Sequence, residues 1–176
     1  PGGWFVNAGT LRKSAGTGVG GLTGFDMVLG GWVEVQAGTL RFNGGGNRTL
    51  GAVATVAGGA MLDLAAGNFH DAGGSFVGAG SSQLTGGTLM LDTNTLAGLR
   101  HTGGTIVLGP GFQQAGAITN LVLDGSTLAA LLNSTDFPAT RFVVSSNAAA
   151  TTETLAQAIV TLSAVKAAGL SSRIPE

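Results

Sequence analysis

Carboxylates are the side chains in this chain best suited to chemistry. A glycan-processing β-helix enzyme would use two of them as an acid and base pair, and a calcium site would cluster them. Here they are scattered, one or two in each repeat: Asp26, Glu34, Asp63, Asp71, Asp92, Asp124 and Asp136. Aligning the repeats described below places Asp63 on one outward column with Arg12, Arg41, Met90 and Val107. This alignment predicts a surface ion pair between Asp63 and arginine and not a catalytic pair.

Histidine and serine are the other reactive side chains. The elements of a hydrolase triad are present as His70, Asp71, Ser75, Ser81, Ser82 and His101. However, neighbours on a strand point to opposite faces, and the two histidines have no defined spacing to an acid that would indicate zinc. The glycine-rich segment 16–21 contains no lysine and precedes no helix, unlike a phosphate-binding loop. We therefore predict no catalytic, cofactor-binding or metal-binding residue, and histidines that face solvent or lie in loops.

Tryptophan provides the candidate contact with a ligand. Trp32 precedes Val33 in an alternating run, so that Trp32 faces outward if Val33 and Val35 face inward. An exposed indole can stack on a sugar ring or contact a partner protein. Trp32 is thus our candidate ligand or partner contact, and the alternative is that it packs laterally under a loop. Trp4, beside Phe5, is expected to shield the first coil.

The composition narrows the class of protein. Among 176 residues, 44% are hydrophobic, only 10% are charged, and 32 are glycines. This many apolar residues argues against disorder and for a fold with many tight turns. A formal net charge of -1, without any run of like charges, makes nucleic acid and anionic membranes poor partners. Cysteine is absent, which excludes disulfides and thiolate metal sites.

One short phrase recurs along the chain and predicts the fold. It reads Ala37-Gly38-Thr39-Leu40-Arg41-Phe42 in one copy and Gly86-Gly87-Thr88-Leu89-Met90-Leu91 in another. Its central apolar residues are Leu11, Leu40, Leu62, Leu89, Ile106 and Leu128. The spacings between successive members of this series are 29, 22, 27, 17 and 22 positions. Such spacing is typical of solenoid coils and is about half that of propeller blades. We expect these six residues to lie over one another in one column of a dry core.

Alternation within the phrases indicates half-buried strands. The residues predicted to face inward are Leu40, Phe42, Leu62, Leu64, Leu89, Leu91, Ile106 and Leu108. Further alternating runs at 32–35, 53–56 and 121–123 predict more than one strand in each coil, with glycine at the corners. The predicted fold is all-β, a right-handed parallel β-helix (β-solenoid) of about five to six coils over residues 1–136.

The pattern changes after about Asp136. Residues 141–144 predict a terminal strand, and residues 152–168 place Leu155, Ile159 and Leu162 on one helical stripe. We expect residues 137–176 to form a C-terminal α-helical cap or extension, and we expect no membrane insertion of this segment. Since the chain begins Pro1-Gly2-Gly3, it is expected to be a piece of a longer protein.

The Gly-Thr-Leu phrase with its Gly-Gly corners resembles the passenger repeats of autotransporters and other filamentous-haemagglutinin-like bacterial exoproteins. The resemblance covers about residues 8–130. It implies an exported, surface-displayed β-helix that serves as an adhesin, a stalk or a carrier, and it implies no catalytic residue or cofactor.

These observations favour a structural or adhesive segment of a secreted, cell-surface bacterial protein that is not an enzyme. Its expected partners are a host or surface glycan or protein, or further copies of itself through the solenoid ends. Two alternatives stay open: a glycan-processing β-helix enzyme of lyase or tailspike type, and a self-assembling extracellular fibre subunit.

Overall fold

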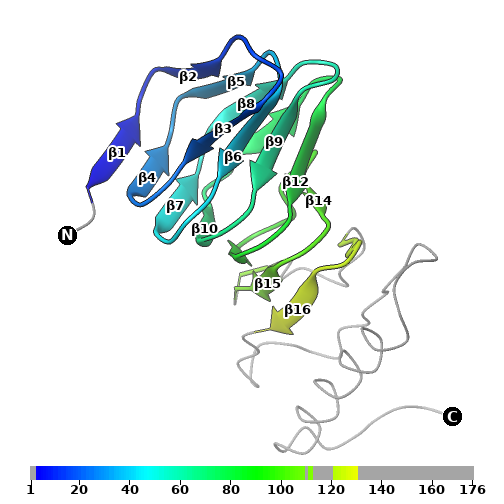
Figure 1. Cartoon of the computed structure of the whole chain (residues 1–176). Helices are drawn as coiled ribbons and strands as arrows, with labels where there is room; N and C mark the ends of the chain where they lie inside the picture. The colour runs from blue at the N-terminus through cyan, green and yellow to red at the C-terminus, as the bar shows by residue number, and fades with distance from the viewer. Residues whose placement is uncertain (1–2, 110, 113–120, 131–176) are drawn as a thin grey trace, which may run out of the picture.

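The computed structural model describes residues 3–109, 111–112 and 121–130. These residues form a parallel β-solenoid of about six turns, as the repeats predicted. Figure 1 shows the coils stacked in chain order, from blue at the N-terminus to yellow at β16. The predicted strand at 141–144, the helix at 152–168 and the boundary at residue 136 lie outside the described residues. No helix capable of crossing a membrane occurs in the described ranges.

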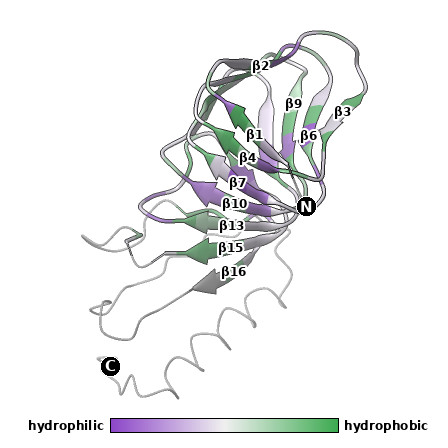
Figure 2. Cartoon of the chain, turned by 90° about the vertical axis from the view of Figure 1, so that its left-hand side faces the viewer, coloured by the Kyte–Doolittle hydropathy of each residue, from purple (hydrophilic) through white to green (hydrophobic). Residues whose placement is uncertain are grey.

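Three parallel sheets form the faces of the solenoid. Sheet A has seven strands, seen one below another in Figure 2: β1 (Trp4–Asn7), β4 (Asp26–Leu29), β7 (Asn47–Leu50), β10 (Asn68–Asp71), β13 (Thr88–Leu91), β15 (Thr105–Leu108) and β16 (Thr127–Ala130). Sheet B has four: β2 (Thr10–Lys13), β5 (Trp32–Val35), β8 (Val53–Val56) and β11 (Ser75–Val77). Sheet C has five: β3 (Val19–Leu22), β6 (Thr39–Phe42), β9 (Met61–Leu64), β12 (Ser81–Leu84) and β14 (Arg100–His101).

Each of the first four coils contributes one strand to each sheet. The strands are only two to four residues long because a corner follows each of them. Glycine makes several corners possible. Gly38, for example, has φ +63°, and a Cβ atom there would lie 2.4 Å from the Gly16 carbonyl oxygen of the preceding coil. Only a residue without a side chain fits such a corner at the spacing of adjacent strands.

The core is one continuous apolar column inside the three sheets. All eight residues predicted to face inward are buried, which confirms the alternation: Leu40, Phe42, Leu62, Leu64, Leu89, Leu91, Ile106 and Leu108. The predicted strands at 32–35 and 53–56 are β5 and β8. The predicted strand at 121–123 is wrong. These residues pair with no strand, and they are followed by a bend that leads into β16.

The single column of marker residues is also wrong. Leu40 and Leu62 are direct neighbours in sheet C. Leu89, however, lies in sheet A with Ile106 and Leu128, and Leu11 pairs with Val33 in sheet B. The physical reason is that the phrase encodes a glycine turn followed by a strand, and such a turn occurs at different corners. Gaps of 29 and 27 residues therefore cover one coil and part of the next.

Candidate functional site

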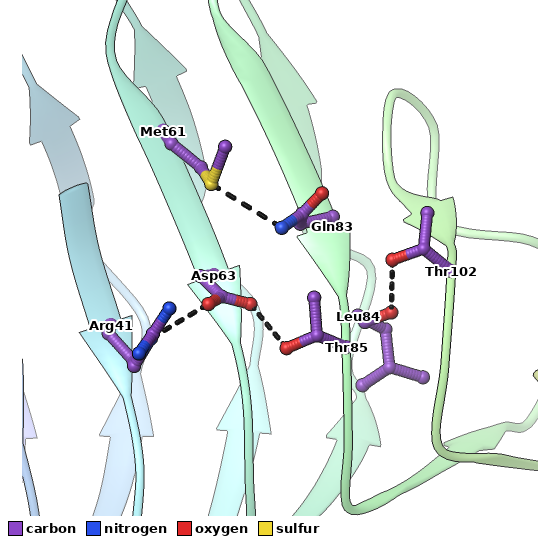
Figure 3. A network of polar contacts seen from close by, with 7 residues as sticks. All are labelled: Arg41, Met61, Asp63, Gln83, Leu84, Thr85 and Thr102. Atoms are coloured by element: carbon purple, nitrogen blue, oxygen red, sulfur yellow. Dashed lines mark hydrogen bonds and ion pairs between the residues drawn. The ribbon is translucent and has the colours of Figure 1, made fainter. Parts of the chain in front are cut away.

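A polar network joins consecutive coils on the outer face of sheet C (Figure 3). Arg41 Nε donates a hydrogen bond of 2.8 Å to Asp63 Oδ2. Thr85 Oγ1, one coil further along, donates to Asp63 Oδ1 at 2.6 Å. Asp63 therefore uses both of its carboxylate oxygens to connect its own coil with the coils on either side. Short hydrogen bonds to an ionised carboxylate are stronger than hydrogen bonds between two neutral groups.

The arginine partner of Asp63 was predicted, whereas its surroundings were not. Arg41 lies directly opposite Asp63 in the register of β6 and β9. The other expected members of the column lie elsewhere, Arg12 in sheet B and Met90 and Val107 in sheet A. Asp63 is only 1% exposed, whereas Arg41 is 40% exposed, so the carboxylate of this pair is buried and not on the surface as expected. Repeat alignment did not reveal this burial, because it cannot show that Arg41 and the neighbouring coils cover the carboxylate.

Trp32 points outward from sheet B, as its position beside Val33 and Val35 predicted. Its exposed fraction is 54%, while Val33 and Val35 are buried. Thr10 and Val53 lie beside it in register on the two neighbouring strands. The indole is therefore largely open to solvent and does not pack under a loop.

A second ion pair lies beside Trp32 on the same face. Arg12 Nε donates to Glu34 Oε2 at 2.6 Å, and Gln36 Nε2 donates to the same oxygen at 3.3 Å. The hydrogen bond to Glu34, assisted by its charge, raises the pKa of Arg12. Arg12 and Glu34 are directly opposite each other in β2 and β5. We call Trp32, Arg12, Glu34 and Gln36 the Trp32 platform.

Sheet A has a ladder of small polar side chains on its outer face. Asp26 Oδ1 accepts a hydrogen bond of 2.6 Å from the backbone N–H of Asn47. Asn68 Nδ2 then donates to Asn47 Oδ1 at 3.2 Å. In Figure 2 the hydrophilic colour in sheet A is strongest on β7 and β10, which contain these asparagines. The ladder joins three successive coils by side-chain contacts.

An arginine at an inward position of β7 points into the core. Arg48 is 1% exposed, and its Cζ atom lies 5.4 Å from the centre of the Phe69 ring. Its Nη1 donates to the Ala66 carbonyl at 2.7 Å, and its Nη2 to the Asn43 and Gly44 carbonyls at 3.3 and 3.2 Å. Burial lowers the pKa of Arg48, and the charge of Asp26 offsets this only in part. The alternation at 47–50 was the available signal, since it places Arg48 on the same face of the strand as Leu50, which is buried.

The two histidines lie on different sheets, His70 in sheet A and His101 in sheet C, and they differ in burial. His70 is exposed on β10, as expected, whereas His101 is buried at 4% exposure, which contradicts the expected solvent-facing position. His101 Nδ1 lies 3.1 Å from the Val122 carbonyl oxygen, and burial lowers the pKa of its ring. Within the described ranges, no three acid or histidine side chains gather at a point where they could hold a metal ion.

A shallow groove of about 360 Å³ follows the corners between sheets B and C. Its lining consists of small and hydroxyl-bearing residues with one methionine, namely Thr17, Gly38, Thr39, Gly59, Ala60, Met61, Ala79, Gly80 and Ser81. The groove has no charged side chain in its lining. The geometry thus offers an exposed aromatic platform on sheet B and a neutral groove at the corners between sheets B and C.

Comparison with known proteins adds no family or function to the fold described above. No protein family, curated protein or solved structure matches this chain significantly.

Proposed function

We propose that this chain is a non-catalytic structural and adhesive segment of a secreted, cell-surface bacterial protein. It acts as a stalk or passenger scaffold that holds an exposed face in a fixed position for a partner. The observation that carries this proposal is the use of carboxylates as connectors between coils.

Three ion pairs link successive coils along the solenoid. Glu34 accepts from Arg12, Asp63 accepts from Arg41, and Asp124 Oδ2 accepts from Arg100 Nη2 at 3.1 Å. Asp26 serves the same purpose through Asn47. In a solenoid each coil contacts only the coils next to it. Ion pairs and hydrogen bonds between neighbouring coils therefore stiffen the stack. A stiff stack of coils suits a spacer.

Deleting one whole coil tests the scaffold role. Removing residues 47–67 joins Gly46 to Asn68, whose backbone N–H already donates to the Gly46 carbonyl. The shortened protein should fold, with a rod shorter by about 4.8 Å and an unchanged cross-section in small-angle X-ray scattering. In the matched control, residues 47–57, about half a coil, are deleted. This variant should be unfolded, because the strands that follow the deletion lose their register in the sheets. Equal tolerance of both deletions would contradict a coil-by-coil scaffold.

A cleavage screen separates the scaffold from the enzyme alternative. The purified protein is incubated with a panel of acidic and neutral polysaccharides, and new reducing ends are measured. We expect no turnover, since the carboxylates that pair with arginine are fixed as acceptors between coils. Turnover that disappears in an Asp63→Asn or Asp92→Asn protein would establish a glycan-processing enzyme instead.

Self-association is a second candidate function, favoured by the first coil. β1, β2 and β3 are the outermost strands of their sheets, and Phe5 and Leu11 are only partly buried there. Unpaired strand edges beside apolar side chains promote strand addition. A fibre subunit would show a mass that increases with concentration in analytical ultracentrifugation. A constant monomer mass would remove this candidate.

A further inference from the structure

The Trp32 platform combines an open aromatic ring with polar groups that are held in place. Trp32 and Glu34 are two residues apart on β5, so both face outward, about 6.6 Å apart along the strand. Arg12 lies opposite Glu34 on the neighbouring strand. The platform is therefore about as wide as one or two sugar rings.

The bonds within the platform leave hydrogen-bonding capacity directed at solvent. Arg12 and Gln36 both donate to the same oxygen, Glu34 Oε2. Within the described part of the chain, no bond engages the second carboxylate oxygen of Glu34 or the terminal guanidinium nitrogens of Arg12. These atoms provide an acceptor and several donors side by side, which is the combination that a hydroxyl group requires.

The charge of the platform also limits the ligand. The charges of Arg12 and Glu34 cancel, and their short hydrogen bond holds them together. A charged ligand would therefore gain little net attraction and would compete with an existing ion pair. A neutral, hydroxyl-rich ligand can bond to both groups without separating them.

From this geometry we infer that the Trp32 platform binds a neutral saccharide whose ring hydroxyls are all equatorial, as in a β-linked glucose chain. In such a ring the C–H bonds form an apolar face, which stacks on the indole of Trp32. The equatorial hydroxyls at the ring edge then reach Arg12, Glu34 and Gln36. This inference rests on the proposed adhesive function and assigns that function its ligand class.

The two tryptophans of the chain allow a direct test. Trp4, 70% exposed on β1 in sheet A, is the only other tryptophan in the sequence. A Trp4→Phe protein retains Trp32 as its sole fluorescent indole, and titration with cellohexaose should shift its emission saturably. A Trp32→Phe protein retains only Trp4 and should show no saturable shift.

Calorimetry with cellohexaose measures the contribution of each group. Trp32→Ala should weaken binding about tenfold or more, through loss of the stacking contact. Trp4→Ala, the matched control, should change the affinity less than about twofold, and Arg12→Ala should weaken binding by an intermediate factor. A glucuronate hexamer of the same linkage should bind no more tightly than cellohexaose. Circular dichroism verifies that each variant is folded.

Several results would overturn this inference. Unchanged affinity in Trp32→Ala, equal loss in Trp4→Ala, or tighter binding of the charged hexamer would each contradict a neutral saccharide site at Trp32. Absence of saturable binding to cellohexaose would also overturn it. The scaffold proposal is tested separately by the coil deletion and survives any of these outcomes.

Discussion

The Arg12–Glu34 pair on sheet B and the Arg41–Asp63 pair on sheet C differ in the burial of the acid. Asp63 is almost fully buried, whereas Glu34 is partly exposed. Removing one partner of a buried pair leaves a charge that water cannot solvate, while an exposed pair contributes little.

We therefore predict different costs for two matched substitutions. Arg41→Ala should lower the free energy of unfolding by about 2 kcal/mol, since Thr85 still donates to Asp63 and Arg41 is itself partly exposed. Arg12→Ala should cost clearly less than Arg41→Ala, because Arg12 and Glu34 both remain in contact with solvent. Urea denaturation of both variants measures the difference, and equal costs would contradict the role of burial.

His101 makes the stability of the chain depend on pH. Burial lowers the pKa of its ring below the ordinary value of 6.5, and the Val122 carbonyl and Asp124 offset this only in part. The unfolded chain therefore takes up a proton at a higher pH than the folded protein does. The stabilisation is complete above about pH 6.5 and is lost as pH falls from there towards the folded pKa.

The histidine prediction has an internal control. His70 is the only other histidine and is exposed on β10. Urea midpoints measured between pH 8 and pH 5 should fall in the wild type and in His70→Gln, and should fall less in His101→Leu. Arg100 and Asp124 form the ion pair that adjoins His101, so the ionic strength is kept constant. The same pH dependence in His101→Leu would contradict the assignment.

Individual residues show where sequence reasoning succeeds and where it does not. Alternation next to Val33 and Val35 correctly predicted an outward Trp32, because strand parity is a local property. The burial of Asp63 was not predictable, since it depends on the neighbouring coils that cover this outward side chain. Polar residues at inward positions also conflict with their usual preference for the surface.

At the scale of the elements, corner glycines differ in their surroundings although their backbone conformations agree. Gly87 has φ +78°, and a Cβ atom there would lie 2.4 Å from the Gly67 carbonyl oxygen. Gly73 has φ +82° and nothing within 4 Å of a Cβ atom. Both positions strain an L-residue, but only Gly87 also lies close to the backbone of the preceding coil.

This contrast gives a second pair of matched substitutions. Gly73→Ala should cost about 1 kcal/mol, through the backbone strain alone. Gly87→Ala should cost at least about 2 kcal/mol, because the corner must also move away from the neighbouring coil. Thermal unfolding of the two variants checks the order, and a larger loss in Gly73→Ala would show that the corner is packed differently.

The elements also explain how the predicted register went wrong. A glycine turn followed by alternating residues identifies the start of a strand, and most strand positions followed from it. The same local sequence serves at the A–B corner before Leu11, the B–C corner before Leu40 and the C–A corner before Leu89. Local patterns therefore predict strands and their inward faces, whereas assignment to a sheet requires the length of each corner.

For the whole molecule, the central claim is that three parallel sheets stack in the register described here. Because the chain has no cysteine, introduced pairs can crosslink only with each other. Thr39 and Met61 are neighbours in sheet C, whereas Met61 and Thr88 would be neighbours only in a single column of phrases. Adjacent parallel strands bring Cα atoms to about 4.8 Å, within the range that a disulfide spans.

Crosslinking of these two cysteine pairs is the most direct measurement. After mild oxidation, intact mass and peptide mapping should show an intramolecular disulfide in Thr39→Cys/Met61→Cys and none in Met61→Cys/Thr88→Cys. The opposite result, or crosslinking of neither pair in folded protein, would contradict the three-sheet solenoid.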